Sequence, residues 1–310
     1  MNTSTSVLII AYRRSENLKK ILAICVEKKI ETIYVNLDGP RGHDEKHDVD
    51  ECQDVLSDFK VNFPGKLHIR TSPVNKGSAV SVLESCDWIF QNEEFAIILE
   101  DDCMPEQDFF DFIEDSKTIL YSLNEVFSIS GTQFAPPRVT KGEWALSRYP
   151  LFWGWATTKS RWEVARHQLS KIEIKGGRKF FLNYSEYCFW KSGAIRSLDG
   201  FVDAWDLPLL YSLALDQKLH IQPGENLVKN VGVDLVATHT TKPNQWIGRE
   251  CVRYTRSNIN PTLNLNLDKW LFEHFYKIKM RHIYSTRLTF LLDLIGINKR
   301  VRSPLKNRWS

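Results

Sequence analysis

The chain has 310 residues, of which 43% are hydrophobic and 25% are charged, as expected for an ordinary folded protein with a substantial core. Its net charge is only +3, and its six cysteines form no Cys-x-x-Cys pair, which argues against a zinc knuckle or a redox dithiol. Scattered cysteines, with no signal-like or membrane-spanning apolar run, predict a protein of the reducing cytoplasm.

Apolar runs alternate with amphipathic segments through the first 130 residues. The first predicted helix begins near Ser15 and carries Leu18, Ile21, Leu22 and Val26 on one face. The expected strands are residues 7–11, 32–37, 67–70, 95–99 and 126–130, and the other expected helices are residues 43–59, 79–90 and 108–121. This alternation predicts an α/β fold with a mainly parallel central sheet flanked by helices.

The pattern changes after Gly131, where aromatic residues become frequent and the regular alternation of strands and helices is lost. No linker rich in Pro, Gly or Ser separates the two parts, so we expect the second part to be built onto the same sheet. The expected division is a first half (residues 1–132), a second half of the same domain (133–265) and a C-terminal helical basic segment (266–310).

Three adjacent carboxylates, Glu100, Asp101 and Asp102, follow the predicted strand 95–99. Adjacent acids repel one another unless a cation lies among them. Ligands of open α/β sheets bind beyond the carboxyl ends of the strands, and oxygen ligands suit Mg²⁺ and Mn²⁺. The position therefore favours a divalent-cation site facing a diphosphate over a solvated acidic loop.

Two other strand ends carry polar residues. Asp38 follows strand 32–37 in an Asp-Gly-Pro turn, and Tyr12 and Arg14 follow strand 7–11, which ends at Ala11. A turn Asp before Gly is common, but its position at the carboxyl end of a strand favours a binding role. Lys76 follows the third strand, where an approach to a diphosphate and a solvated loop position remain equally open.

Four features of the chain occur in a distinctive order. They are residues 7–14 (VLIIAYRR), residues 99–102 (LEDD) with 108–110 (DFF), residues 152–157 (FWGWAT), and residues 205–206 (WD) followed by 223–228 (PGENLV) and 238–240 (THT). The ordered set resembles the GT-A-fold glycosyltransferases that use nucleotide-sugar donors, in particular bacterial polysaccharide-type enzymes related to N-acetylglucosaminyltransferase I. The resemblance implies that the first half binds the donor and the second half binds the acceptor.

The resemblance implies roles for the acid triplet. Asp102 would ligate a Mn²⁺ or Mg²⁺ ion that bridges both phosphates of the donor and stabilises the leaving group. Glu100 and Asp101 would face hydroxyl groups of the donor sugar and the ribose, because carboxylates accept hydrogen bonds from adjacent hydroxyls.

The resemblance also implies how the nucleotide is held. Asp38 would accept a hydrogen bond from the N3–H group of uracil, which makes a UDP-sugar the expected donor. Ala11, Tyr12 and Arg14 match positions near the nucleotide, whereas Arg13 is expected to be a surface charge.

Trp205-Asp206 matches the family position of the catalytic base. An inverting transferase needs a general base to take the proton from the acceptor hydroxyl, and a carboxylate is the usual choice. The resemblance therefore implies Asp206 as that base, with Asp203 and Asp199 as rivals on the same loop. Asp206 could also be a helix N-cap before Pro208, and the two roles are compatible.

Two assignments stay open at this point. Residues 152–155 could form a wall of the sugar site, with Trp155 against the donor sugar, or could be core aromatics. His239 could be a second metal ligand or contact a phosphate, as a late histidine does in many GT-A enzymes. A lone histidine is more often a hydrogen-bonded structural residue.

The C-terminal segment is strongly basic. From Lys277 to Ser310 there are nine lysine and arginine residues and one acidic residue, a net charge of +8, which leaves −5 for the rest of the chain. The short apolar patch between the bases, residues 288–295, suits the surface of an anionic membrane, which would place the enzyme near a polyprenyl-linked acceptor. A core-packed helix with solvated bases is the alternative, and the acidic remainder argues against a nucleic-acid partner.

The leading hypothesis is thus a hexosyl- or N-acetylhexosaminyl-transferase of cell-surface polysaccharide assembly, inverting and metal-dependent. Its acceptor would be a glycan or a lipid-linked sugar, and the protein would be cytoplasmic or peripheral on the inner face of the cytoplasmic membrane. A sugar-phosphate nucleotidyltransferase is disfavoured, because residues 11–14 (AYRR) lack the Gly-rich loop expected after the first strand. A non-catalytic glycan-binding scaffold is disfavoured because the acids and Trp205-Asp206 are intact.

Overall fold

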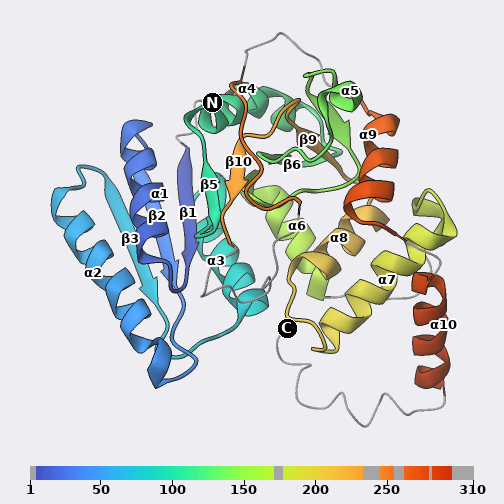
Figure 1. The fold of residues 1–310 in the computed structure, drawn as a ribbon, viewed down its shortest axis with the longest axis horizontal. Helices are drawn as coiled ribbons and strands as arrows, with labels where there is room; N and C mark the ends of the chain where they lie inside the picture. Colours follow the sequence, from blue (N-terminus) through green and yellow to red (C-terminus); the bar gives the residue numbers. More distant parts are fainter. Residues whose placement is uncertain (1–4, 171–176, 233–244, 255–261, 279–280, 295–310) are drawn as a thin grey trace.

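The computed structural model describes residues 5–170, 177–232, 245–254, 262–278 and 281–294. Within them, an eight-stranded sheet has the strand order β3-β2-β1-β4-β8-β6-β9-β7 and is covered by helices (Figure 1). Its strands are β1 (Ser6–Ala11), β2 (Thr32–Leu37), β3 (Lys66–Thr71), β4 (Phe95–Glu100), β6 (Val126–Ser130), β7 (Ala145–Ser147), β8 (Trp155–Thr158) and β9 (Leu219–Gln222). A two-stranded sheet pairs β5 (Cys103–Pro105) with β10 (Val228–Asn230).

The larger helices follow the strands in sequence. They are α1 (Ser15–Glu27), α2 (Lys46–Asn62), α3 (Ser78–Asn92), α4 (Gln107–Ser122), α6 (Lys159–Ser170), α7 (Tyr184–Leu198), α8 (Asp206–Leu215) and α10 (Arg281–Leu294). Shorter pieces are α5 (Pro137–Thr140), α9 (Leu265–Trp270), the 3₁₀ turns η1 (His43–Glu45) and η2 (Arg178–Phe180), and the π-helical turn η3 (Leu271–Phe275). Every strand and helix expected in the first 130 residues is present, within a few residues of its expected bounds.

The sheet is mainly parallel. Strands β1, β2, β3 and β4 are parallel neighbours, and β6 and β9 are also parallel to each other. Strand β8 lies antiparallel between β4 and β6, and β7 is antiparallel to β9. The predicted α/β fold with a mainly parallel sheet flanked by helices is confirmed.

Alternate residues of β1 enter different cores, because successive side chains of a strand point to opposite faces. Val7 and Ile9 pack with apolar residues of α1, α2 and α4, whereas Leu8 and Ile10 pack with those of α3, α6 and α8. Both faces of the strand are therefore buried, which explains its unbroken apolar sequence.

The second half adds a third core beside the sheet. In Figure 1, α7, α9 and α10 lie together on the side opposite α1 and α2. Leu267 and Leu271 are fully buried in this core. The buried carboxylate of Asp268 accepts hydrogen bonds from the Ser147 hydroxyl at 2.7 Å and from Nε of Arg148 at 2.9 Å, which joins α9 to the end of β7. The division of the chain at residues 132 and 265 stays an expectation.

Two local features differ from the sequence expectation. Val26 is 44% exposed, and Cys25 takes its place on the buried face of α1, since 25 continues the helical spacing of Leu18, Ile21 and Leu22. Strand β5 was not expected, because three residues carry no periodic signal and the strand forms only by pairing with the distant β10.

Candidate active site

The carboxyl ends of β1, β2 and β4 bring the polar residues together at one edge of the sheet. Backbone pairing aligns Ala11 with Leu37 and Ile10 with Glu100, so the next residues of all three strands emerge side by side. The N–H group of Asp38 donates to the Ala11 carbonyl at 2.9 Å, and that of Asp101 donates to the Ile10 carbonyl at 3.0 Å. The sheet register itself therefore positions these two acids.

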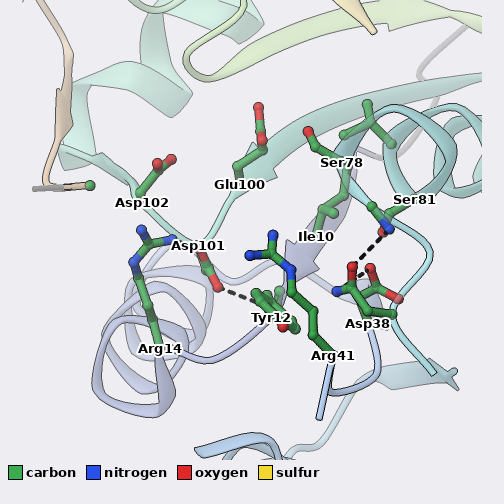
Figure 2. Close-up of a pocket in the computed structure, with 15 residues that line it drawn as sticks. Ile10, Tyr12, Arg14, Asp38, Arg41, Ser78, Ser81, Glu100, Asp101 and Asp102 are labelled. Carbon is green, nitrogen blue, oxygen red and sulfur yellow. Dashed lines mark hydrogen bonds and ion pairs between the residues drawn. The ribbon is translucent and has the colours of Figure 1, made fainter. Parts of the chain in front are cut away.

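A pocket of about 120 Å³ opens at this edge (Figure 2), and we call it the donor pocket after the role that the sequence analysis expects for its residues. Its floor is formed by the strand ends, and the loop before α3 closes one side. Its lining comprises Ile10, Ala11, Tyr12, Arg14, Asp38, Arg41, Asn75, Gly77, Ser78, Ser81, Val82, Glu100, Asp101, Asp102 and Gly232. Ala11, Tyr12, Arg14, Asp38 and the acid triplet, all expected in the site from the sequence, thus line one pocket.

Asp101 holds the loop after β1 in place. One carboxylate oxygen accepts a hydrogen bond from the Tyr12 N–H group at 2.8 Å, and the other pairs with the Arg14 guanidinium at 2.7 Å (Figure 2). Burial raises the pKa of Asp101 to about 6, and the Arg14 charge opposes that rise. These contacts use both carboxylate oxygens, so Asp101 positions Arg14 in addition to any contact with a ribose hydroxyl.

Glu100 and Asp102 make the pocket electronegative. The pKa of Glu100 lies well above its usual value because its carboxyl group is withdrawn from water and faces the charges of Asp102, Asp101 and Asp206. The crowding of four acids is unfavourable in the protein alone, and a bound cation would relieve it.

Asp38 is buried at the base of the pocket. Its carboxylate accepts hydrogen bonds from the Gly39 N–H group at 2.9 Å, the Lys76 N–H group at 3.0 Å and the Asn75 side-chain amide at 3.1 Å. Burial raises its pKa, while these donors lower it. Asp38 thus fixes the loop before α3, and Lys76 takes part through its backbone; the Lys76 ammonium pairs with Glu84.

Arg41 is a pocket residue that the sequence analysis did not identify. It lies just beyond the Asp38-Gly39-Pro40 turn, and its guanidinium lies 5.6 Å from the centre of the Tyr12 ring (Figure 2). Arg13, in contrast, points to Glu45 and Asp48, with which it forms ion pairs. The position of Arg41 after the carboxyl end of β2 was a signal that could have located it.

A second, larger pocket of about 580 Å³ adjoins the donor pocket, and we call it the acceptor pocket after the role that the sequence analysis expects for Asp206. The two pockets share four lining residues: Ser78, Glu100, Asp102 and Gly232. Asp206 lines the acceptor pocket at the start of α8, where Trp205 occupies the N-cap position, so Asp206 is not the cap of this helix. Sequence positions more than 100 residues apart thus meet at the boundary of the two pockets.

Asp203 has a different role from Asp206. Its two carboxylate oxygens accept hydrogen bonds from the N–H groups of Ser78 and Ala79, each at 3.0 Å. Both donors belong to the first turn of α3, whose N–H groups have no partner within the helix. Asp203 therefore caps α3 from a distant segment, whereas Asp199 lies at the C-cap of α7 and does not line the acceptor pocket.

Trp155 is not part of either pocket. It is 1% exposed and packs among the rings of Phe127, Phe152, Trp162 and Trp205 in the core under α3, α6 and α8. Of the two interpretations of residues 152–155, core packing applies to Trp155, so the expected contact of Trp155 with the donor sugar is wrong. Phe152 and Trp153 do line the acceptor pocket. His239 lies outside the described residues.

The residues at the pocket boundary fit a divalent cation bound by few protein ligands. The missing side chain of Gly232 leaves room beside Asp102: a Cβ atom there would lie 2.5 Å from Oδ2 of Asp102. The described residues contain no cluster of three or more ligand side chains that could hold a metal. Mg²⁺ is commonly held by one or two carboxylates, with phosphate oxygens and water as the remaining ligands, so Asp102 with a diphosphate would suffice.

Gly232 reaches this position through the small sheet. Val228–Asn230 pairs with Cys103–Pro105, and the N–H group of Val231 donates to the Asp102 carbonyl at 2.8 Å. No local sequence signal marks Gly232, because its place depends on this long-range pairing.

Comparisons with known proteins identify no family. No family model and no curated protein sequence matches the chain. Among solved structures, the mannosyltransferase PcManGT from Pyrobaculum calidifontis, in complex with GDP-Man and Mn²⁺, shares 13% identity over 70% of each chain, with a TM-score of 0.39. Mannose-1-phosphate geranyltransferase from Thermus thermophilus shares 12% identity over 71% of this chain and 73% of its own, with a TM-score of 0.36.

A third similar structure is 4-diphosphocytidyl-2C-methyl-D-erythritol synthase from Anaerococcus prevotii, with 11% identity over 56% of this chain and 80% of its own, and a TM-score of 0.34. The names of the similar structures thus give different reactions. At this distance they carry no argument about the reaction, which has to rest on the two pockets.

Proposed function

We propose that the protein is a metal-dependent, inverting glycosyltransferase that moves a sugar from a nucleoside-diphosphate donor to a hydroxyl group of a glycan. The observation that carries the proposal is the shared boundary of the donor and acceptor pockets, with Glu100 and Asp102 on it and Asp206 facing it. Such an arrangement suits a reaction in which an acceptor hydroxyl attacks a donor whose diphosphate leaves on the other side.

The geometry favours this reaction over nucleotidyl transfer. A nucleotidyltransferase of this sheet type holds its triphosphate with free N–H groups of a Gly-rich loop after the first strand. Here the N–H group of Tyr12 in that loop is bonded to the Asp101 carboxylate. The donor pocket instead offers the guanidinium groups of Arg14 and Arg41 to an anion.

The chain's own residues would supply distinct parts of the reaction. Arg41 and Arg14 would bind the diphosphate, with Arg14 oriented by Asp101. Glu100 would orient hydroxyl groups of the donor sugar. Asp206 would accept the proton of the acceptor hydroxyl as the new bond forms, while the sugar–phosphate bond breaks and the nucleoside diphosphate departs.

A divalent cation fits this site, with Asp102 as its protein ligand. When bound, the ion would act as a Lewis acid that stabilises the negative charge of the departing diphosphate. The finer resemblance to N-acetylglucosaminyltransferase I supports UDP as the nucleotide, with Asp38 near the base. His239 is retained in this proposal as a further candidate ligand from the sequence.

We also propose that α10 docks on an anionic membrane surface. One side of the helix packs on α7, where Ile283 is buried. Tyr284, Leu288 and Leu291 recur at helical spacing and are 65%, 57% and 59% exposed, and the segment around them is basic. No described helix has the length and apolarity needed to cross a bilayer, so any contact of α10 would lie along the surface.

The proposed donor chemistry is tested by thermal-shift screening of nucleotide sugars, nucleoside diphosphates and nucleoside triphosphates with and without Mn²⁺. A bound donor stabilises the fold by mass action, by about 2.7 kcal/mol at a hundredfold excess over Kd. We expect Mn²⁺-dependent stabilisation by one nucleoside diphosphate in the wild-type protein and its loss in Asp102→Ala. Unchanged Mn²⁺-dependent binding in the variant would disprove the role of Asp102, and stabilisation by nucleoside triphosphates alone would favour nucleotidyl transfer.

A further inference from the structure

The acceptor pocket has walls of aromatic and apolar side chains. The rings of Phe134 and Phe275 are stacked with their centres 4.0 Å apart, and Trp153 meets Phe134 edge-on at 5.1 Å. The other apolar and aromatic residues of the lining are Pro150, Leu151, Phe152, Val202, Ala204, Trp205, Leu210, Ile247 and Tyr276. The C–H faces of a sugar ring pack well on such surfaces.

The C-terminal part of the chain supplies one wall through an unusual turn. Leu271–Phe275 forms a π-helical turn, a rare conformation that often occurs at functional sites. The turn places Phe275 and Tyr276 in the pocket lining, while Phe272 of the same turn is not among the lining residues. The Tyr276 hydroxyl donates to the Pro150 carbonyl at 3.1 Å, which ties this wall to the loop after β7.

The two pockets differ in whether cationic side chains line them. The donor pocket contains the cations Arg14 and Arg41 beside its acids. The described residues that line the acceptor pocket include no lysine or arginine, and their only charged groups are the carboxylates of Glu100, Asp102, Asp203 and Asp206. An anionic group would be repelled there, whereas neutral hydroxyl groups can donate to carboxylates.

We propose that the acceptor is an uncharged sugar ring that stacks on the Phe275–Trp153 side of the acceptor pocket and has no phosphate or carboxylate next to the reacting ring. This inference rests on the proposed glycosyl transfer and narrows its substrate. It selects a neutral glycan end over a sugar attached directly to a polyprenyl diphosphate, because the latter would bring its diphosphate against Asp203 and Asp206, the two acids of the acceptor pocket that do not line the donor pocket.

The test uses the full chain, Mn²⁺ and the nucleotide sugar that gives the largest thermal shift. Release of the nucleoside diphosphate is measured with water alone and with 4-nitrophenyl glycosides of glucose, galactose, mannose and N-acetylglucosamine. The glucoside and galactoside are each compared with the matching 4-nitrophenyl uronide, which carries a carboxylate in place of the CH₂OH group at C6. We expect at least one neutral glycoside to raise the release rate above that with water, and its uronide to be at least about tenfold poorer in kcat/KM.

Three variants test the residues. Phe275→Leu keeps an apolar side chain but removes the ring face, and should raise the KM for the neutral glycoside about tenfold with little change in the KM for the donor. Phe272→Leu is the matched control on the same turn and should change neither constant. Ile247→Lys adds a cation to the lining and should improve use of the uronide relative to the glycoside.

The outcomes separate this inference from the proposed function. Two outcomes would disprove an uncharged acceptor and leave the donor chemistry intact. One is equal or better use of the uronides. The other is no stimulation by any neutral glycoside while the donor is still cleaved by water. Equal effects of the Phe275 and Phe272 substitutions would show that the acceptor does not stack on Phe275. If no nucleotide sugar binds or is cleaved, the proposed function fails and this inference fails with it.

Discussion

The substitutions Asp206→Asn and Asp203→Asn should affect different properties, turnover and stability respectively, although the two acids are three residues apart and line the same pocket. Asparagine keeps the size of the side chain but is not a proton acceptor at neutral pH. A positioned general base typically contributes a factor of about 10²–10⁴, so Asp206→Asn should lower kcat by that range with little effect on donor affinity. Asp206 is the first residue of α8, and the loss of its charge there should cost less than about 1 kcal/mol of stability.

Asp203→Asn should affect stability instead. Its carboxylate accepts hydrogen bonds from the N–H groups of Ser78 and Ala79, each at 3.0 Å. The amide can accept one of these bonds but presents its own N–H groups to the other donor. Loss of a cap bond and of a negative charge at the start of α3 should cost about 1–2 kcal/mol, with less than about a tenfold change in kcat.

The assay combines urea unfolding of each variant with release of the nucleoside diphosphate and donor titration. Retained donor affinity in Asp206→Asn would distinguish a lost base from a collapsed pocket. If Asp203→Asn were folded but lost turnover by a hundredfold or more while Asp206→Asn stayed active, Asp203 would be the base. If neither substitution lowered turnover, an inverting mechanism with a carboxylate base would be wrong.

Three further predictions follow from other parts of the structure. Arg41→Gln should weaken binding of the nucleoside diphosphate about tenfold, as measured by calorimetry. Arg13→Gln is the control and should not weaken it, because Arg13 pairs with Glu45 outside the donor pocket. Equal effects of the two substitutions would show that Arg41 does not bind the nucleoside diphosphate. Burial lowers the pKa of His220 to about 3, so below pH 6.5 the unfolded state takes up a proton that the folded state does not. The free energy of unfolding should therefore fall by about 3 kcal/mol between neutral pH and pH 4.5. His220→Gln should flatten this part of the pH dependence measured by urea unfolding, and an unchanged pH dependence would show that His220 is not its cause. Leu288→Asp with Leu291→Asp should reduce co-sedimentation with vesicles containing phosphatidylglycerol, and unchanged sedimentation of a folded variant would exclude α10 as the docking surface.

The sequence alone determined the strand and helix order of the first half, because its apolar periodicity is local and strong. Asp38 and the acid triplet could be placed at the same edge of the sheet, since residues that follow parallel strands meet there. The confirmed α/β fold came from the same reasoning. Cys25 rather than Val26 on the buried face of α1 shows the usual error of about one residue in such patterns.

Only the tertiary structure decided which acids and aromatic residues belong to the pockets. Asp203 and Asp206 look equivalent in sequence, but in the fold the carboxylate of Asp203 lies at the N-terminus of α3 and accepts hydrogen bonds from the N–H groups of Ser78 and Ala79. Trp155 and Trp153 differ by two residues, yet Trp155 is fully buried in the core. The sequence of the second half shows no regular alternation of strand and helix patterns, so the contacts of its residues could not be read from local periodicity. Long-range packing sets them: β10 carries Gly232 to Asp102, and the π-helical turn carries Phe275 to the acceptor pocket. Such placements depend on surfaces that exist only once the chain has folded.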